Sequence, residues 1–220
     1  MTTRHYDVVV VGAGIVGPNG SGKSILLKTV AGLTTLYQGT IKHNEQEITG
    51  WASHKIARSG IAFLPQTDNV FTNLTITENL RLAGYKINQD EYRRRLKRIF
   101  QLFPQLLAYT GTKAFSLSGG ERQMLAMALA LIREPNVMML DEPTANLAPK
   151  IATQVLNLIS SLAKEAGLTV LLAEQNAKRA LEIGDVAYLL VGGKNAFEGT
   201  ARELLEHKEL GRLYLGVLAS

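Results

Sequence analysis

Eight consecutive residues near the start of the chain carry the clearest chemical signal in the sequence. They satisfy every required position of a phosphate-binding loop, which is glycine, four free residues and then Gly-Lys-Ser: Gly17, Pro18, Asn19, Gly20, Ser21, Gly22, Lys23 and Ser24. Glycines let consecutive backbone N–H groups face phosphate oxygens, and a helix that begins here adds partial positive charge. The sequence therefore predicts that Lys23 reaches the β- and γ-phosphates of a nucleotide, while the Ser24 hydroxyl is a ligand of Mg²⁺.

Two adjacent carboxylates, Asp141 and Glu142, follow the apolar residues 137–140. In a chain with a phosphate-binding loop, such a pair at the end of a buried strand indicates a division of roles. Asp141 would hold Mg²⁺, directly or through water, and Glu142 would polarise an attacking water as general base. The alternative is an acid that caps a helix before Pro143, and the upstream loop favours the catalytic interpretation.

A second potential phosphate site opens a later helix. The segment consists of Ser118, Gly119, Gly120 and Glu121. Ser118 can serve as a simple N-cap, but two successive glycines at a helix start also leave backbone N–H groups open to an anion.

A competing motif overlaps the loop. Gly12, Gly14 and Gly17 satisfy the dinucleotide fingerprint Gly-x-Gly-x-x-Gly after the valine run at residues 8–11, which predicts a strand. The fingerprint also expects an acidic residue about twenty positions on, to hold the ribose. No acid lies between Gly17 and Gln38, so a flavin- or nicotinamide-binding enzyme is the weaker alternative.

The remaining pattern predicts one α/β domain. Periodicity and turn residues predict further strands at residues 39–41, 60–65, 137–140 and 169–173 and a hairpin at 186–198. Gln66 follows one of these strands and the pair Glu174-Gln175 closes another. Residues 67–117 show no clear strand; a Thr75/Glu78 capping box and a helix at about 88–103 indicate a helical insertion.

Composition restricts the functional classes. The 220 residues are 46% hydrophobic and include no cysteine, so disulfides and thiolate metal sites are excluded. The net charge of +5 owes much to a basic cluster, whose pattern favours a solvated helix face over nucleic-acid binding: Arg93, Arg94, Arg95, Lys97 and Arg98. No apolar run approaches the ~18 residues of a spanning helix, so a membrane role would require a partner.

Together, these motifs resemble the ATP-binding subunits of ABC transporters over about residues 15–220. In that family residues 17–24 form the Walker A motif, Gln66 lies in the Q-loop, residues 118–121 form the signature, and Asp141-Glu142 belong to Walker B. Residues 146–149 and 172–176 look like those of branched-chain amino acid importer ATPases, and importers for urea or short amides share much of this pattern.

The resemblance implies a P-loop NTPase core of the ABC type, residues 1–66 and 118–220, with a helical subdomain at 67–117, all within a single domain. It implies hydrolysis of ATP to ADP and phosphate with Mg²⁺, catalysis by Glu142 with Gln66 and Gln175, and Mg²⁺ sensing by Gln66. Two such subunits, identical or different, would pair head to tail with ATP between one Walker A loop and the other signature. The pair would act on permease subunits at the cytoplasmic face of the inner membrane, and nucleic acid is not an expected partner.

Three features depart from the family pattern. Ala148 stands where most members have Asp, and Gln175 replaces the switch histidine; Gln175 can hydrogen-bond a γ-phosphate oxygen but cannot become a cation. Only sixteen residues precede Gly17, and Tyr6 is the only aromatic residue among them, so we expect an incomplete N-terminal antiparallel β part. Loss of base stacking would weaken nucleotide binding by ~1–3 kcal/mol. A subunit that docks on a permease but hydrolyses poorly is therefore a second hypothesis.

Overall fold

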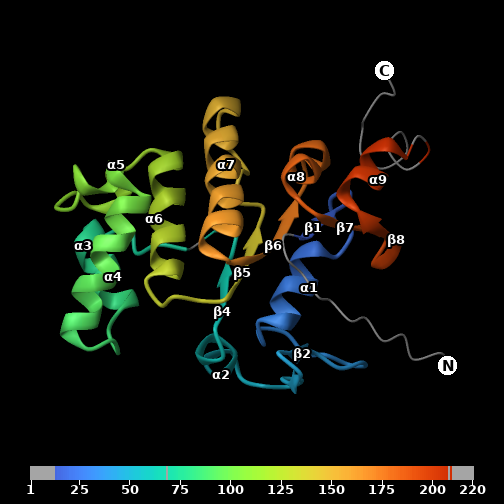
Figure 1. The fold of residues 1–220 in the computed structure, drawn as a ribbon, viewed down its shortest axis with the longest axis horizontal. Coiled ribbons are helices and arrows are strands. Elements are labelled where there is room, and N and C mark those ends of the chain that lie inside the picture. The colour runs from blue at the N-terminus through green and yellow to red at the C-terminus, as the bar shows by residue number, and fades with distance from the viewer. Residues whose placement is uncertain (1–12, 68, 208, 210–220) are drawn as a thin grey trace.

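A six-stranded sheet forms the centre of the molecule in the computed structural model, which describes residues 13–67, 69–207 and 209 (Figure 1). The first five strands in spatial order run parallel, and the last is antiparallel to its neighbour. The spatial order is β4 (Ile61–Leu64), β5 (Val137–Asp141), β6 (Thr169–Glu174), β1 (Ala13–Val16), β7 (Val186–Val191) and β8 (Lys194–Thr200). The chain is therefore an α/β protein with a mostly parallel sheet, as the sequence predicted.

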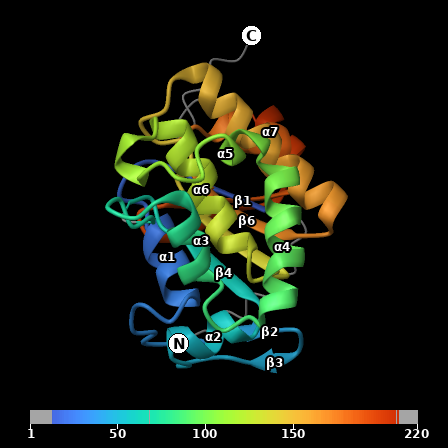
Figure 2. The same cartoon turned by 90° about the vertical axis from the view of Figure 1, so that its left-hand side faces the viewer.

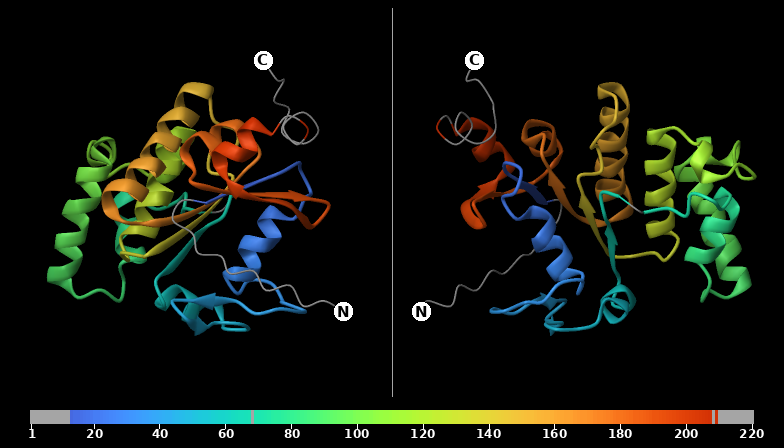
Figure 3. Two further views of the ribbon diagram at one scale, coloured as in Figure 1. Left: turned by 45° about the vertical axis from the view of Figure 1, so that its right-hand side comes forward. Right: turned by 180° about the vertical axis from the view of Figure 1, so that it is seen from behind.

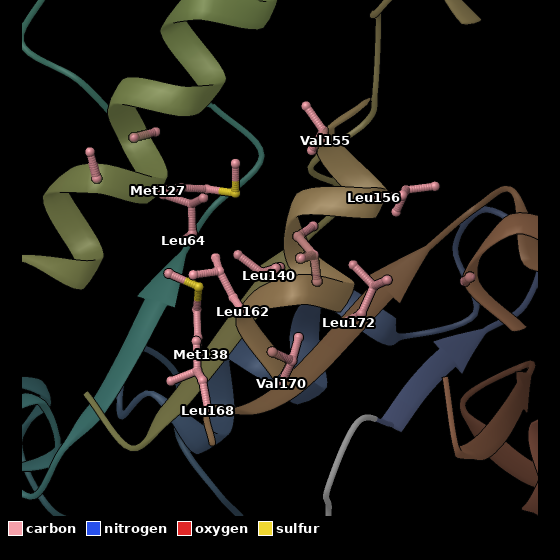
Figure 4. Packing of buried hydrophobic residues seen from close by; sticks show 14 of the residues in the cluster. Leu64, Met127, Met138, Leu140, Val155, Leu156, Leu162, Leu168, Val170 and Leu172 are labelled. Atoms are coloured by element: carbon pink, nitrogen blue, oxygen red, sulfur yellow. The ribbon is translucent and has the colours of Figure 1, made fainter. Parts of the chain in front are cut away.

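Helices cover both faces of this sheet (Figure 1, Figure 3). One face carries α6 (Gly119–Leu131), α7 (Pro149–Ala166), α8 (Ala177–Ile183) and α9 (Ala201–Glu206), and the other carries α1 (Lys23–Val30) and α2 (Ser53–Arg58). Successive strand residues point to opposite faces. In β5, Met138 and Leu140 pack with α6 and α7 (Figure 4), whereas Met139 belongs to the cluster that contains Leu27 of α1. Both faces are apolar, which suits a buried parallel sheet.

A group of helices lies beyond the β4 edge and packs against α6 (Figure 2). It comprises α3 (Ile76–Ala83), α4 (Gln89–Leu102), α5 (Pro104–Leu107) and a short 3-10 helix, Ala114–Ser116. The predicted capping box is present, since Thr75 and Glu78 bond each other's backbone N–H groups, and Asn88 caps α4. Among the described residues between 69 and 117, the only β pairing is an isolated bridge.

The strand before the phosphate-binding loop is β1, and the valine run at residues 8–11 lies outside the described residues, as do Tyr6 and Gly12. Gly14 lies inside this buried strand, paired with Leu172 and Ala187. A dinucleotide fingerprint needs its second glycine in the turn after the strand, where the backbone approaches a pyrophosphate. Gly14 is therefore not in the turn that the fingerprint requires: it faces Ala180 of α8, whose carbonyl oxygen would lie 3.9 Å from an added Cβ.

The strand expected at residues 39–41 is also wrong. The structure instead places a short antiparallel hairpin later, at β2 (Lys42–His43) and β3 (Gln46–Glu47). Its turn residues, Asn44 and Glu45, both adopt left-handed backbone conformations, with φ of 48° and 62°. The apolar periodicity gave no sign of this hairpin, because its four strand residues are all polar.

Candidate active site

The carboxyl ends of the parallel strands bring the predicted site residues to one edge of the sheet. The loop at residues 17–24 follows β1, Gln66 follows β4, Asp141 ends β5 and Gln175 follows β6. The register aligns these ends, because Val16 lies opposite Glu174 and Ala173 lies opposite Asp141. Ligands of open α/β sheets bind at this edge.

The phosphate-binding loop adopts backbone conformations that favour glycine. Gly20 and Gly22 have φ of +74° and +101°. At Gly17, with φ of +151°, an added Cβ would lie 2.1 Å from the carbonyl oxygen of Leu190 in β7. The turn after β7 also supports the loop, since the Gly193 N–H donates to the Ser21 carbonyl at 3.1 Å. The loop is therefore held between α1 and the β7–β8 hairpin.

Replacing Gly17 with alanine should destabilise the protein more than the same change at Gly20. Both positions have positive φ, where an L residue is strained, so both variants carry a backbone cost of about 1–2 kcal/mol. An added Cβ at Gly20 meets nothing within 4 Å, whereas the clash at Gly17 is with backbone of a central strand. We expect Gly17→Ala to lower the free energy of unfolding by about 2 kcal/mol more than Gly20→Ala in denaturant titration. Equal losses of unfolding free energy in the two variants would mean that backbone strain alone, and not the clash with Leu190, requires glycine at position 17.

The lysine and serine of the loop contact the two successive carboxylates at the end of β5, Asp141 in the strand and Glu142 just after it. Lys23 is buried, and its Nζ donates to the carbonyls of Gly17 at 2.8 Å and Pro18 at 3.1 Å. The same ammonium lies 4.0 Å from Glu142 Oε1. Ser24 Oγ donates to Asp141 Oδ1 at 2.8 Å, across 117 positions of sequence. The structure thus joins the two motifs that the sequence singled out separately.

Glu142 has an unusual backbone conformation for its residue type. Its φ is +47°, in the left-handed region that non-glycine residues rarely adopt. Its N–H donates to the Ala173 carbonyl at 2.8 Å, and Gln66 Nε2 donates to its carboxylate at 3.1 Å. Conformations of this kind cost of order 1–3 kcal/mol and cluster at active sites. Glu142 is therefore held in a fixed direction beside Lys23.

The residues present fit a nucleotide phosphate with Mg²⁺. Ser21 Oγ is buried and has no hydrogen-bond partner among the described residues, beside glycines that open backbone N–H groups. Ser24 and Asp141 supply two hard oxygen donors at one place. Mg²⁺ is commonly bound through one or two carboxylates plus substrate phosphates, so a large carboxylate cluster is not required.

Two predicted site segments form no side-chain hydrogen bond with this constellation among the described residues. Ser118 starts α6, where it forms a capping box with Glu121; its N–H and Oγ donate to the Glu121 carboxylate at 2.8 and 2.7 Å. No hydrogen bond or ion pair of the described residues joins residues 118–121 to the loop at 17–24. Gln175 is exposed, and its side chain forms no hydrogen bond within the described part of the chain.

Sequence reasoning assigned no role to two neighbours of the site. Glu174 is almost fully buried, and it accepts hydrogen bonds from Thr144. The available signal was an acidic residue at the end of an apolar run, the same signal that identified Asp141. The second missed neighbour is Gly193, and a glycine pair in a hairpin turn gave no hint that its N–H reaches the loop.

The basic cluster of α4 is largely engaged in ion pairs. Arg94 and Arg95 both bind Glu91, and these hydrogen bonds lower the pKa of Glu91 to about 2. Arg94, Arg95 and Arg98 also pair with Glu134 at the end of α6. These contacts attach α4 to the segment that leads into β5.

Comparison with known proteins identifies the family. The family model described as ABC transporter matches residues 12–145, more than half of the chain. The chain belongs to the ABC transporter family. A protein of Archaeoglobus fulgidus named probable branched-chain amino acid transport ATP-binding protein LivF is 53% identical over 204 residues, covering 93% of this chain and 86% of that protein. The high-affinity branched-chain amino acid transport ATP-binding protein BraG of Pseudomonas aeruginosa is 39% identical, covering 92% and 86%.

Solved structures of ATP-binding cassettes share the fold. The ADP conformation of one ABC transporter cassette has a TM-score of 0.81 and 26% identity, and the match covers 92% of this chain and 87% of that chain. A dimeric cassette bound to ADP and phosphate in a post-hydrolysis state has a TM-score of 0.77 and 25% identity, covering 90% and 88%. The chain is thus an ABC-type ATPase that binds ATP, and the flavoprotein alternative finds no support.

Proposed function

We propose that this ABC ATPase powers an importer for branched-chain amino acids. The observation that carries the proposal is the 53% identity to the LivF protein, which extends over 93% of this chain. BraG, with 39% identity, is named for the same class of solute. Importers for urea or short amides are the alternative that the experiment below must exclude.

The geometry supports one division of roles for hydrolysis. Lys23 and backbone N–H groups of the loop at residues 17–24 would bind the β- and γ-phosphates, and Ser24, Asp141 and Gln66 would hold Mg²⁺. The bound ion neutralises charge on the phosphate oxygens. Glu142 accepts a proton from water as the water oxygen bonds to the γ-phosphorus and the bond to the ADP oxygen breaks. Its fixed direction and its distance of 4.0 Å from the Lys23 ammonium suit this role.

Two subunits, identical or different, would complete each site. Ser118 caps α6, and the backbone N–H groups of Gly119 and Gly120 in its first turn form no hydrogen bond among the described residues. Head-to-tail pairing would place them on the γ-phosphate held by the other chain, where a helix N-terminus stabilises negative charge. Glu121 would orient this segment through its capping bonds. Gln175, which is exposed here, would then hydrogen-bond a γ-phosphate oxygen.

The helical group is the proposed route to the membrane partner. We divide the single domain into a core, residues 1–66 and 118–220, and a helical subdomain, residues 67–117. Gln66 lies at the junction and contacts Glu142, so a change at the nucleotide can reach the helices that would contact the permease. None of the helices that the structure describes is long and apolar enough to cross a membrane. The subunit would act at the cytoplasmic face of the inner membrane, bound to permease subunits.

The solute class can be tested in the assembled transporter. With permease subunits and a solute-binding protein in lipid vesicles, we expect leucine, isoleucine or valine to stimulate ATP hydrolysis severalfold, because solute binding shifts the transporter toward its hydrolytic state. Urea and acetamide serve as the matched alternatives. Stimulation by urea or acetamide alone would reject the amino-acid assignment.

A further inference from the structure

Glu174 is a buried carboxylate that the mechanism above does not use. It ends β6 at the active edge of the sheet, and only 3% of its surface is exposed. Its strand lies between the strand that leads into the phosphate-binding loop and the strand that carries Asp141. In the register, Glu174 is opposite Val16, the last residue before Gly17.

The carboxylate of Glu174 is bonded mainly by Thr144, and the backbone of Gln175 also bonds it. Its Oε1 accepts a hydrogen bond from the Thr144 N–H at 3.0 Å and another from Thr144 Oγ1 at 2.7 Å. Burial raises the pKa of Glu174 most, and the nearby Glu142 carboxylate raises it further, while the two bonds from Thr144 and a bond from the Gln175 backbone lower it. A buried carboxylate is costly unless it is hydrogen-bonded, so these bonds, two of them from Thr144, offset the cost of burying it.

Thr144 lies two residues after Glu142, and the segment between them is tightly constrained. Glu142 has a left-handed backbone, Pro143 has a fixed φ, and the Ala145 N–H closes a turn onto the Glu142 carbonyl at 3.0 Å. A left-handed glutamate persists only where its surroundings determine the conformation. Here the surroundings are the end of β6, because Ala173 binds the Glu142 N–H and Glu174 binds Thr144.

We infer that Glu174 is a positioning residue, whose carboxylate fixes the turn at Thr144 and thereby the direction of the Glu142 side chain. The inference rests on the proposed role of Glu142 as general base. Two successive residues of β6 hold the segment 142–144 at both of its ends, so the backbone that directs the Glu142 side chain toward Lys23 and Gln66 cannot turn without breaking one of these contacts. Because Gln175 follows directly, the same carboxylate also connects the γ-phosphate contact proposed for Gln175 to the general base.

The test compares steady-state ATP hydrolysis of variants of the full chain. Glu174→Leu removes the acceptor, and Thr144→Val removes one of the two donors. We expect kcat to fall about 10- to 100-fold in Glu174→Leu and about 3- to 10-fold in Thr144→Val, with the KM for ATP within twofold, because a misplacement near 1 Å at the reacting group costs rate rather than ground-state binding. The double variant should be no slower than Glu174→Leu, since both changes break the same contact. Glu174→Gln, which retains an oxygen acceptor, should recover most of kcat.

Val170→Ala is the matched control for stability. Val170 is buried in the same strand and distant from the active edge, so this change should lower the melting temperature and leave kcat unaltered. Unchanged kcat in folded Glu174→Leu and Thr144→Val would overturn the inference, as would equal losses of kcat in these variants and in Val170→Ala. If Glu174→Leu does not fold, the kcat of Thr144→Val alone tests the inference. Glu142→Gln, measured in the same series, separates the role of Glu142 from that of Glu174. Retained turnover in Glu142→Gln would reject Glu142 as the general base. Lost turnover in Glu142→Gln together with normal turnover in Glu174→Leu would reject only the positioning role of Glu174.

Discussion

Turnover of ATP should fall by about 10²- to 10⁴-fold when Glu142 is replaced by glutamine. An amide has nearly the same shape as the carboxylate, but it cannot accept the proton of the attacking water, so the variant loses general-base catalysis while the loop stays intact. Release of phosphate at saturating Mg-ATP measures the effect. Glu182→Gln, at an exposed position of α8, makes the same change of charge and should retain full turnover.

The same variant should capture ATP between two chains. With hydrolysis slowed, Mg-ATP should convert the protein from a single chain of 24.0 kDa to twice that mass in light scattering, and ADP should not. A dimer that forms only with ATP would mean that the phosphate-binding loop and residues 118–121 work together in trans. Turnover above a tenth of the unaltered rate would contradict the role of Glu142, and a mass that never changes would contradict the pairing.

The chemistry of the site was largely predictable because each motif is local in sequence. The loop needs only eight residues, and Asp141-Glu142 need only the strand before them. Their meeting could also be anticipated, since both follow strands of a parallel sheet, whose carboxyl ends share one edge. The hydrogen bond from Ser24 to Asp141 shows that the two motifs do meet at this edge.

What the sequence could not predict depends on the order of strands in space. Burial of Glu174 arises because β6 lies between β1 and β5, which no local pattern reveals. The left-handed backbone of Glu142 depends on contacts with Ala173 and, through Thr144, with Glu174. Two glycine motifs overlap on Gly17, and strand pairing favours the phosphate-binding loop. Gly14 pairs with β6 and β7 as a residue of β1, so it does not lie in the turn that the dinucleotide motif needs.

The β2–β3 hairpin shows why strands made of polar residues are not predicted from apolar periodicity. Hairpin β2–β3 has no apolar residue in its strands, so the alternation that signals a half-buried strand is missing. Its position is fixed instead by contacts next to it, where Ile41 bonds Thr49 and the adjacent Ile48 is buried. Local turn chemistry at Asn44 and Glu45 completes it.

Replacing Lys23 with alanine should weaken ATP binding by about 30-fold to several thousand-fold. The ammonium is buried and in this structure satisfies the carbonyls of Gly17 and Pro18 while it lies near Glu142. Removing it costs the charge-assisted bonds to phosphate and leaves two loop carbonyls without a donor, and losses of about 2–5 kcal/mol are typical when a buried hydrogen-bonded charge is truncated. Calorimetric titration of ATP into the variant measures the change in Kd.

A lysine on the same helix provides the control. Lys28 is exposed in the last turn of α1, so Lys28→Ala should bind ATP within twofold of the unaltered protein. Titration with ADP then tests which phosphate Lys23 contacts. If Lys23 reaches both the β- and γ-phosphates, Lys23→Ala should lose more affinity for ATP than for ADP. Equal losses for the two nucleotides would place the ammonium at the β-phosphate alone, and unaltered ATP affinity would reject Lys23 as a phosphate ligand. A loss of affinity for ATP alone would instead assign the main contact of the Lys23 ammonium to the γ-phosphate, the group that the water activated by Glu142 would attack.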